Sequence, residues 1–213
     1  MPYILWDWNG TLLDDTQAAL DTLNAMLRRR GVKEMDMVFY RDHFSFPARP
    51  FYERIGMSVS DAEWDALARE YHDVYSLQPK RLNPDAVAAL DLMRAAGVKQ
   101  AIISALRQDL LEADVRTYGV ADYFERVCGT DNLDGASKLA GARKMIGLIP
   151  PGEPTIVIGD AFHDKEVADA IGVKCVLHGQ GSHAARRLAA VAPTMPTVLE
   201  ATRLALRILQ GEA

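Results

Sequence analysis

Residues 3 to 14 read Tyr-Ile-Leu-Trp-Asp-Trp-Asn-Gly-Thr-Leu-Leu-Asp, and this stretch decides the fold. A short apolar run ends abruptly on Asp7, and a Gly-containing turn follows at Asn9 and Gly10. This order predicts a buried strand with Asp7 at its carboxyl end. Because ligands of open α/β sheets bind outside the carboxyl ends of the strands, Asp7 is a candidate for chemistry.

The Asn9-Gly10 pair is also the strongest short signal for a β-hairpin, which requires a second strand directly after the turn. Residues 15–30 instead carry apolar side chains at helical spacing, with Asp15 or Thr16 in a position to cap the helix. The sequence therefore predicts a strand followed by a helix.

The rest of the chain divides into a helical block and an alternating block. Within residues 15–83 the helices are predicted at 15–30, 35–43, from 49, and at 60–77. Beyond residue 83 the strands are predicted at 100–104, 126–129, 155–159 and 174–177. The helices between and after them are predicted from 84, and at 107–118, 137–149, 163–171 and 197–209.

Strands that alternate with helices predict an α/β fold with a doubly wound parallel sheet, that is, a Rossmann-like core. Residues 1–14 and 84–213 are expected to form this core, and residues 15–83 an inserted α-helical cap. The alternative for residues 15–83 is a separate small bundle with no role at the active site.

Composition excludes several classes of function. The chain has 213 residues, of which 49% are hydrophobic and 25% charged, with a net charge of −5 and a pI near 5.5. This charge does not suggest nucleic-acid binding. The absence of a signal-like start or a spanning apolar run predicts no membrane association and a cytoplasmic location. Cys128 and Cys175 lie in apolar runs and are expected to be buried thiols.

A second strand-end acid occurs in residues 155–164, Thr-Ile-Val-Ile-Gly-Asp-Ala-Phe-His-Asp. Asp164 follows Asp160 by close to one helical turn, which brings both carboxylates to one corner. An acidic helix start stabilised by the helix dipole is the alternative for this segment alone. Taken together with Asp7, these acids are expected to converge on one ion, and Mg²⁺ prefers such oxygen ligands.

Both acidic segments resemble motifs of one family. Asp7-x-Asn9-Gly10-Thr11-Leu12 and Gly159-Asp160-x-x-x-Asp164 are similar to the nucleophile motif and the fourth motif of the haloacid dehalogenase superfamily. Most members are magnesium-dependent phosphatases that form an aspartyl-phosphate. The resemblance covers essentially the entire chain, and the position of the cap resembles the phosphoglycolate phosphatase branch.

The resemblance implies roles for the matching residues. Asp7 would attack phosphorus, and Asp7, the Asn9 carbonyl, Asp160 and Asp164 would ligate Mg²⁺. The phosphate would be bound by three further residues, namely Thr11, Ser104 and Lys138, with Lys144 as the fallback for Lys138. Ala105 replaces an Asn of many relatives. Arg49, in the cap loop 46–52, is the candidate for a substrate carboxylate or a second phosphate, with Tyr52 and His43 as weaker candidates.

Asn9 departs from the family pattern, which has a second Asp here as the general acid. An amide can neither donate an acidic proton nor accept one as a base. General acid–base help is worth about 10² to 10⁴ in rate, so acyl phosphates, aryl phosphates or stabilised phosphonates are better candidates than sugar phosphates. His163, or deamidation of Asn9 to Asp, could restore an acid.

The sequence therefore predicts a magnesium-dependent phosphatase for a small phosphorylated metabolite, as a monomer or homodimer. One alternative is a phosphonatase-like hydrolase in which Lys33, Lys80 or Lys99 forms a Schiff base. The other is a catalytically impaired phosphate-binding pseudoenzyme. Two histidines that follow the last apolar strand, His178 and His183, are expected on a surface turn.

Overall fold

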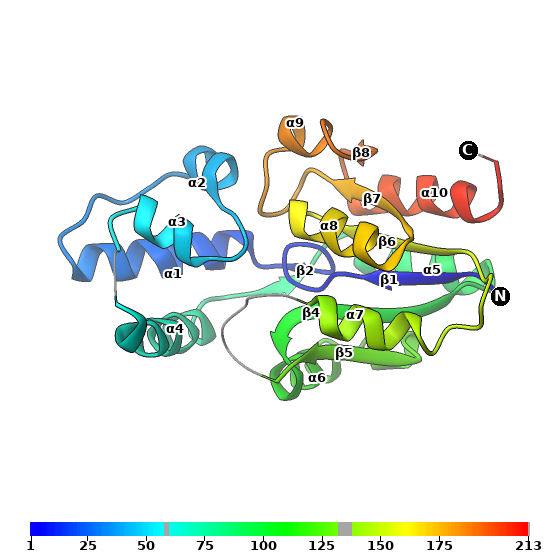
Figure 1. The fold of residues 1–213 in the computed structure, drawn as a ribbon, viewed down its shortest axis with the longest axis horizontal. Helices are drawn as coiled ribbons and strands as arrows, with labels where there is room; N and C mark the ends of the chain where they lie inside the picture. The colour runs from blue at the N-terminus through cyan, green and yellow to red at the C-terminus, as the bar shows by residue number, and fades with distance from the viewer. Residues whose placement is uncertain (58–59, 132–137, 213) are drawn as a thin grey trace.

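The structure is a computed structural model, and it describes residues 1–57, 60–131 and 138–212. Its centre is a six-stranded sheet in the order β5-β4-β1-β6-β7-β8, with parallel pairing throughout (Figure 1). The strands are β1 (Tyr3–Trp6), β4 (Lys99–Arg107), β5 (Arg126–Thr130), β6 (Thr155–Gly159), β7 (Lys174–His178) and β8 (Thr194–Met195). The predicted α/β doubly wound, Rossmann-like core is confirmed.

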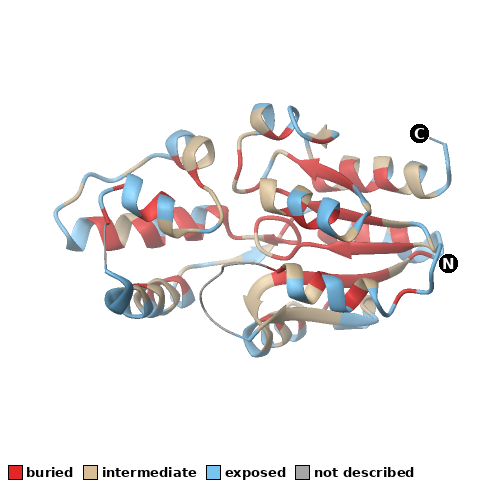
Figure 2. Ribbon diagram, in the orientation of Figure 1, coloured by how far each residue is buried: buried red, intermediate tan, exposed pale blue. Residues whose placement is uncertain are grey.

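Helices cover both faces of this sheet. One face carries α5 (Ala86–Ala95), α6 (Gln108–Thr117) and α10 (Val198–Leu209). The other carries α7 (Leu139–Ile146), α8 (Phe162–Ile171) and α9 (Ala185–Leu188). Along β1, Ile4 and Trp6 pack on the first face, whereas Tyr3 and Leu5 pack on the second, as strand alternation requires. The central strands are consequently buried on both sides (Figure 2).

Strand β1 lies between β4 and β6, which places its end at the centre of the sheet edge. The Asp7 amide still donates to the Ile158 carbonyl at 2.9 Å, so the backbone is held in the sheet up to Asp7. In the sheet, β4 and β5 lie on one side of β1, and the later strands β6, β7 and β8 lie on its other side. The strand order therefore reverses beside β1, and ligands of open α/β sheets bind in the crevice at such a switch point.

A helical block lies beside the sheet, toward the left of Figure 1. It consists of α1 (Thr16–Arg29), α2 (Met37–His43), α3 (Arg49–Arg54) and α4 (Asp61–Ser76). The chain enters it through β2 (Leu13–Asp14) and leaves it through β3 (Arg81–Leu82), and these two strands pair antiparallel. The block has its own apolar core, built around Leu23, Met26, Tyr40 and Phe51. We call this block the cap, and its division from the core at residues 15–83 remains a proposal.

Hydrogen bonds from α2 hold the cap against the core. The Arg41 guanidinium donates to the Gly181 carbonyl at 2.9 Å and to the Gln180 carbonyl at 2.8 Å. The Ala184 amide donates back to the Arg41 carbonyl at 3.1 Å. Arg186 also pairs with Asp42 at 2.7 Å. The loop after β7 therefore connects the cap to the sheet edge that carries the acids.

The structure differs from the sequence predictions in several short elements. Strand β4 continues to Arg107, where it pairs with Thr130 after a register shift, instead of ending at Ser104. A strand does follow the Asn9-Gly10 turn, but β2 has only two residues and pairs with β3, so no β1 hairpin forms. The short elements β3, β8, α9 and the 3₁₀ turn Ala121–Tyr123 were not predicted. The predicted helix start at residue 137 lies outside the described residues.

No helix in the described parts of the chain has both the length and the apolar character needed to cross a bilayer.

Candidate active site

Three buried carboxylates meet at the carboxyl ends of β1 and β6. Asp7 follows β1, Asp160 follows β6, and Asp164 lies in the first turn of α8. Each can offer an oxygen such that all three oxygens lie within 4.8 Å of one another. The acids that the sequence predicted to converge are therefore brought together.

Two glycines make this close approach possible. Gly10 has a φ of +78°, and a Cβ there would lie 2.5 Å from the Asp160 Oδ2 atom. A Cβ on Gly159 would lie 2.0 Å from the Asp164 carboxyl carbon. Real Cβ contacts do not occur at such distances, so any side chain at either position would displace an acid. A positive φ adds a conformational reason for glycine at position 10.

Lys138 brings a buried ammonium to the three acids. Its side chain is 4% exposed, and its Nζ donates to Asp7 Oδ1 at 2.5 Å and also to Asp164 Oδ1. The other Asp164 oxygen accepts from the backbone amides of Asp160 and Ala161, at 3.0 and 2.9 Å. Asp164 thus positions Lys138 and the turn after β6 at the same time.

The charges at this corner are not balanced, because three carboxylates face one ammonium. Burial raises the pKa of Asp7 well above its usual value and, together with the neighbouring Asp164, raises the pKa of Asp160 to about 7. Burial also acts on Asp164, but the attraction of Lys138 outweighs it and lowers the Asp164 pKa. The same acids outweigh desolvation at Lys138 and raise its pKa. The excess of hard, anionic oxygens suits a divalent cation.

The remaining predicted phosphate ligands differ in their surroundings. Ser104 is buried and lines the cavity above Asp7, where its Oγ accepts from the Leu106 amide at 3.1 Å. The Thr11 hydroxyl instead donates to Asp160 Oδ1 at 3.3 Å, and Thr11 is not among the described residues that line the cavity. Asp160 Oδ2 also accepts from the Ser182 amide at 2.5 Å. In this structure Thr11 orients Asp160.

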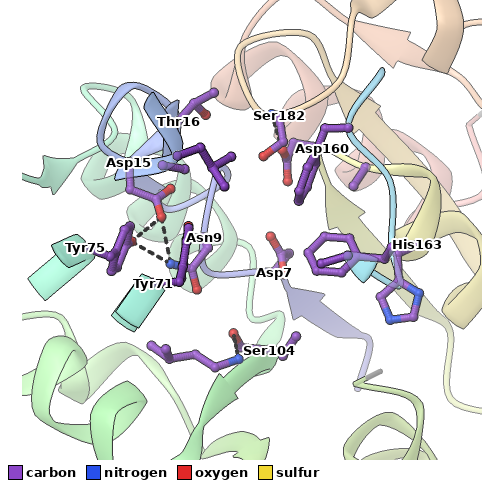
Figure 3. A pocket seen from close by; sticks show the side chains of 18 of the residues that line it. Asp7, Asn9, Asp15, Thr16, Tyr71, Tyr75, Ser104, Asp160, His163 and Ser182 are labelled. Carbon is purple, nitrogen blue, oxygen red and sulfur yellow. Dashed lines mark hydrogen bonds between the residues drawn. The ribbon is translucent and has the colours of Figure 1, made fainter. Parts of the chain in front are cut away.

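Asn9 is held by two residues that the sequence did not single out for this role (Figure 3). Its Nδ2 atom donates to Asp15 Oδ2 at 2.8 Å and to the Tyr75 hydroxyl at 3.1 Å. The Tyr75 hydroxyl donates to Asp15, and the Gly10 amide donates to the other Asp15 oxygen at 2.6 Å. The two acceptors lie on the same side of the Asn9 nitrogen, because the Tyr75 hydroxyl is bonded to the same Asp15 oxygen. These bonds hold the Asn9 amide in place, and an amide is not an acid that could protonate a leaving group.

Asp15 has the position of the α1 N-cap, as predicted, but its side chain makes no capping hydrogen bond. The carboxylate turns back to Gly10 and Asn9 and is buried, which raises its pKa. Burial likewise raises the pKa of Tyr75. No local pattern could have indicated this cluster, since Tyr75 reaches the site from the far end of the cap, 60 positions along the chain.

A cavity of about 170 Å³ opens above Asp7 between the core and the cap. Its floor includes Asp7, Ser104, Lys138 and Asp160. Much of the rest of its wall consists of aromatic rings from the cap, those of Tyr40, Phe44, Phe46, Tyr52, Trp64, Tyr71 and Tyr75. The cap thus has a direct place at the site.

Arg49 does not line this cavity among the described residues. It begins α3, where its guanidinium pairs with Asp61 and lies 3.7 Å from Glu53 and 5.7 Å from the centre of the Trp64 ring. Its neighbour in the predicted substrate loop, Tyr52, does line the cavity. The substrate-binding role of Arg49 remains a prediction.

The histidines lie deeper than the sequence suggested. His163 lines the cavity beside the Phe46 ring, and burial lowers its pKa. His178 and His183 are buried, so the expected surface turn was wrong. His178 contacts the Thr11 hydroxyl at 3.3 Å, and His183 packs between Phe44 and Phe162. Burial lowers the pKa of both to about 4.

Comparison with known proteins agrees with this fold. The model of the haloacid dehalogenase-like hydrolase family matches residues 4–178. The chain belongs to this family.

The proteins to which this chain is similar include one named as a kinase and others named as phosphatases. The chain is 27% identical over 187 residues to the tyrosine-protein kinase PtkA of Mycobacterium tuberculosis, a match that covers 84% of this chain and 62% of that protein. It is 25% identical over 191 residues to a phosphoglycolate phosphatase of Rhodobacter capsulatus, covering 84% and 85% of the two chains. The chain thus spans about six-tenths of the length of PtkA. A predicted phosphatase from Clostridium acetobutylicum shares the fold, with a TM-score of 0.81, 18% identity and 98% coverage of both chains.

Proposed function

We propose that this protein is a magnesium-dependent phosphatase that acts on a small phosphorylated metabolite through an aspartyl-phosphate on Asp7. The observation that carries the proposal is the buried pair of Asp7 and Lys138 beside Asp160 and Asp164. This arrangement combines a nucleophile, a fixed positive charge and a set of oxygen ligands. The similarity to phosphatases of the family supports the same reaction.

The donor set fits the metal that the family implies. Asp7, the Asn9 carbonyl, Asp160 and Asp164 would hold Mg²⁺, and Thr11 and Ser182 would keep Asp160 in place through the hydrogen bonds described above. Bound there, the cation would neutralise charge on the phosphoryl oxygens.

The protein's own residues account for the remaining steps. A carboxylate oxygen of Asp7 attacks phosphorus, the bond from phosphorus to the leaving oxygen breaks, and that oxygen leaves with the electron pair. Lys138 and Ser104 hold the phosphoryl oxygens as the charge moves. Water then attacks the aspartyl-phosphate, which releases phosphate and a proton and regenerates Asp7.

A phosphate-binding pseudoenzyme is the second candidate, and the state of Asn9 favours it. Asn9 is not an acid, and its Nδ2 atom is held by hydrogen bonds to Asp15 and Tyr75. The phosphonatase-like alternative has less support. Its candidate lysines, Lys33, Lys80 and Lys99, are absent from the described lining of the cavity.

Phosphate release from acetyl phosphate and p-nitrophenyl phosphate, with and without Mg²⁺, tests the proposal. We expect magnesium-dependent turnover in the wild type and its loss in Asp7→Asn. Mass spectrometry of the peptide that contains position 9 should show only Asn there in an active sample, which excludes a deamidated minority as the source of activity. Binding of phosphate without turnover would favour the pseudoenzyme.

A further inference from the structure

The cavity above Asp7 offers little to bind a second anionic group. Lys138 is the only lysine or arginine among its described lining residues, and its ammonium already bonds to Asp7 and Asp164. The buried carboxylate of Asp15 also lines the cavity. A substrate carboxylate or second phosphate would thus meet negative charge without a dedicated cation, which disfavours substrates of the phosphoglycolate type.

The cap side of the cavity is instead suited to a flat apolar group. Phe46, Tyr52, Trp64 and Tyr71 contribute rings to the wall, and aromatic rings pack well on one another edge-to-face or offset. The volume of about 170 Å³ covers the phosphoryl end as well as the cap side. Since an apolar cavity of about 150 Å³ binds one benzene, this volume restricts the apolar group to a single small ring.

The chemistry of the leaving group also favours a substrate with an aromatic ring. Asn9 is unable to protonate the leaving oxygen, because an amide is not an acid, and its Nδ2 atom is held by Asp15 and Tyr75. A phenol has a pKa of about 10, roughly six units below that of water, so an aryl oxide departs without a proton from the protein. An alkoxide of a sugar would need that proton.

We propose that the substrate is a small phosphate monoester of an aromatic hydroxyl, with its ring in the cap side of the cavity. The inference rests on the proposed phosphatase function and specifies its substrate class. Asp7 takes the phosphoryl group, the bond from phosphorus to the aryl oxygen breaks, and the aryl oxide leaves with the electron pair. The aryl oxide takes a proton from solvent, and water then releases phosphate from Asp7.

Binding of non-hydrolysable phosphonates separates ring recognition from leaving-group chemistry. Calorimetric titration in the presence of Mg²⁺ should show that phenylphosphonate binds about 10-fold or more tightly than methylphosphonate, because burying a ring is worth at least about 1.5 kcal/mol. Phosphonoacetate, which carries a carboxylate, should bind no more tightly than methylphosphonate. Equal or tighter binding of phosphonoacetate would overturn the proposal.

Substitutions of aromatic residues in the cap test whether the phenyl ring of the ligand binds on the cap side of the cavity. Trp64→Leu and Tyr71→Leu should each weaken phenylphosphonate binding by about 3- to 10-fold, the range expected for losing a ring contact. Tyr71→Phe keeps the ring and should weaken phenylphosphonate binding less than Tyr71→Leu does, which separates the ring contact from loss of the hydroxyl. Phe39→Leu replaces a cap aromatic outside the described lining and should have no effect. Unchanged binding in both Leu variants at positions 64 and 71 would contradict the proposed ring site.

Turnover of acetyl phosphate, which has no ring, distinguishes failure of this inference from failure of the proposed function. Acetyl phosphate turnover without a preference for phenylphosphonate would leave a phosphatase but remove the aryl substrate class. A preference for phenylphosphonate without turnover of acetyl phosphate or phenyl phosphate would remove the phosphatase function, and the aryl substrate class with it.

Discussion

Asn9 and Asp15 form a matched pair, in which an amide donates to a carboxylate at 2.8 Å. Asn9→Asp would place a second carboxylate, in a partly buried position, at this distance from the buried Asp15. We expect this variant to lose about 1 to 3 kcal/mol of stability, the usual effect of an unsatisfied buried polar pair, as measured by denaturant unfolding. The double variant Asn9→Asp/Asp15→Asn exchanges the two groups and should recover most of the loss. A single variant as stable as the wild type would contradict this pairing.

The missing acid–base group at position 9 also affects the second half of the proposed reaction. Water attack on the aspartyl-phosphate would proceed without a general base, which slows it by about 10² or more. With an aryl phosphate we therefore expect a rapid burst of phenol, close to one equivalent per site, before slow steady-state release. Stopped-flow absorbance with p-nitrophenyl phosphate measures this burst. Linear release from the first turnover would contradict the prediction.

The residues of the acid corner were predictable, whereas those that hold Asn9 were not. Asp7 and Asp160 each end an apolar strand, and parallel strands bring their carboxyl ends to one edge, so sequence order and sheet geometry suffice. Tyr75 reaches Asn9 only because the cap folds back over the core. The direction of the Thr11 hydroxyl toward Asp160 depends on packing around His178, which no spacing encodes.

At the scale of elements, α2 connects the cap to the loop after β7. Arg41→Ala removes two hydrogen bonds from a charged donor to the carbonyls of Gln180 and Gly181. We expect kcat/KM for aryl phosphates to fall about 10-fold, because the cap would close less firmly over the cavity. Arg54→Ala, at an exposed position at the end of α3, is the matched control and should behave as the wild type. Equal kinetics of the two variants would show that this contact does not affect the site.

Long elements were predictable and very short ones were not. The helices of the cap and the five longer strands of the sheet carry enough residues to show a period of 3.6 or a continuous apolar run. Strands β2, β3 and β8 have two residues each, too few for any period. The end of β4 was predicted too early because Ser104 resembles a strand terminus, while pairing with β5 extends it to Arg107.

At the scale of the whole molecule, His183 makes the contact between cap and core sensitive to acid. It is buried between Phe44 and Phe162, and this burial lowers its pKa to about 4. The unfolded chain therefore binds this proton more readily than the folded protein, so its contribution to stability falls as the pH decreases from about 6.5 to about 4.

His183→Phe removes this proton-binding site while keeping a ring between Phe44 and Phe162. We expect the free energy of unfolding of the variant, relative to the wild type, to rise as the pH is lowered through the same range. Denaturant unfolding at pH 7.5 and pH 5 measures the difference. A difference that does not change with pH would show that His183 is not the group responsible.

The ribbon of β2 and β3 has a mechanical consequence. The chain enters and leaves the cap through two paired strands, so both covalent connections between cap and core run through one ribbon. Asn9 precedes β2 and lies on the core side of this ribbon, whereas Asp15 and Tyr75 lie on its cap side. A swing of the cap about the ribbon would draw the Asp15 carboxylate and the Tyr75 hydroxyl together away from Asn9. Opening the lid and releasing the Asn9 amide are thus one movement.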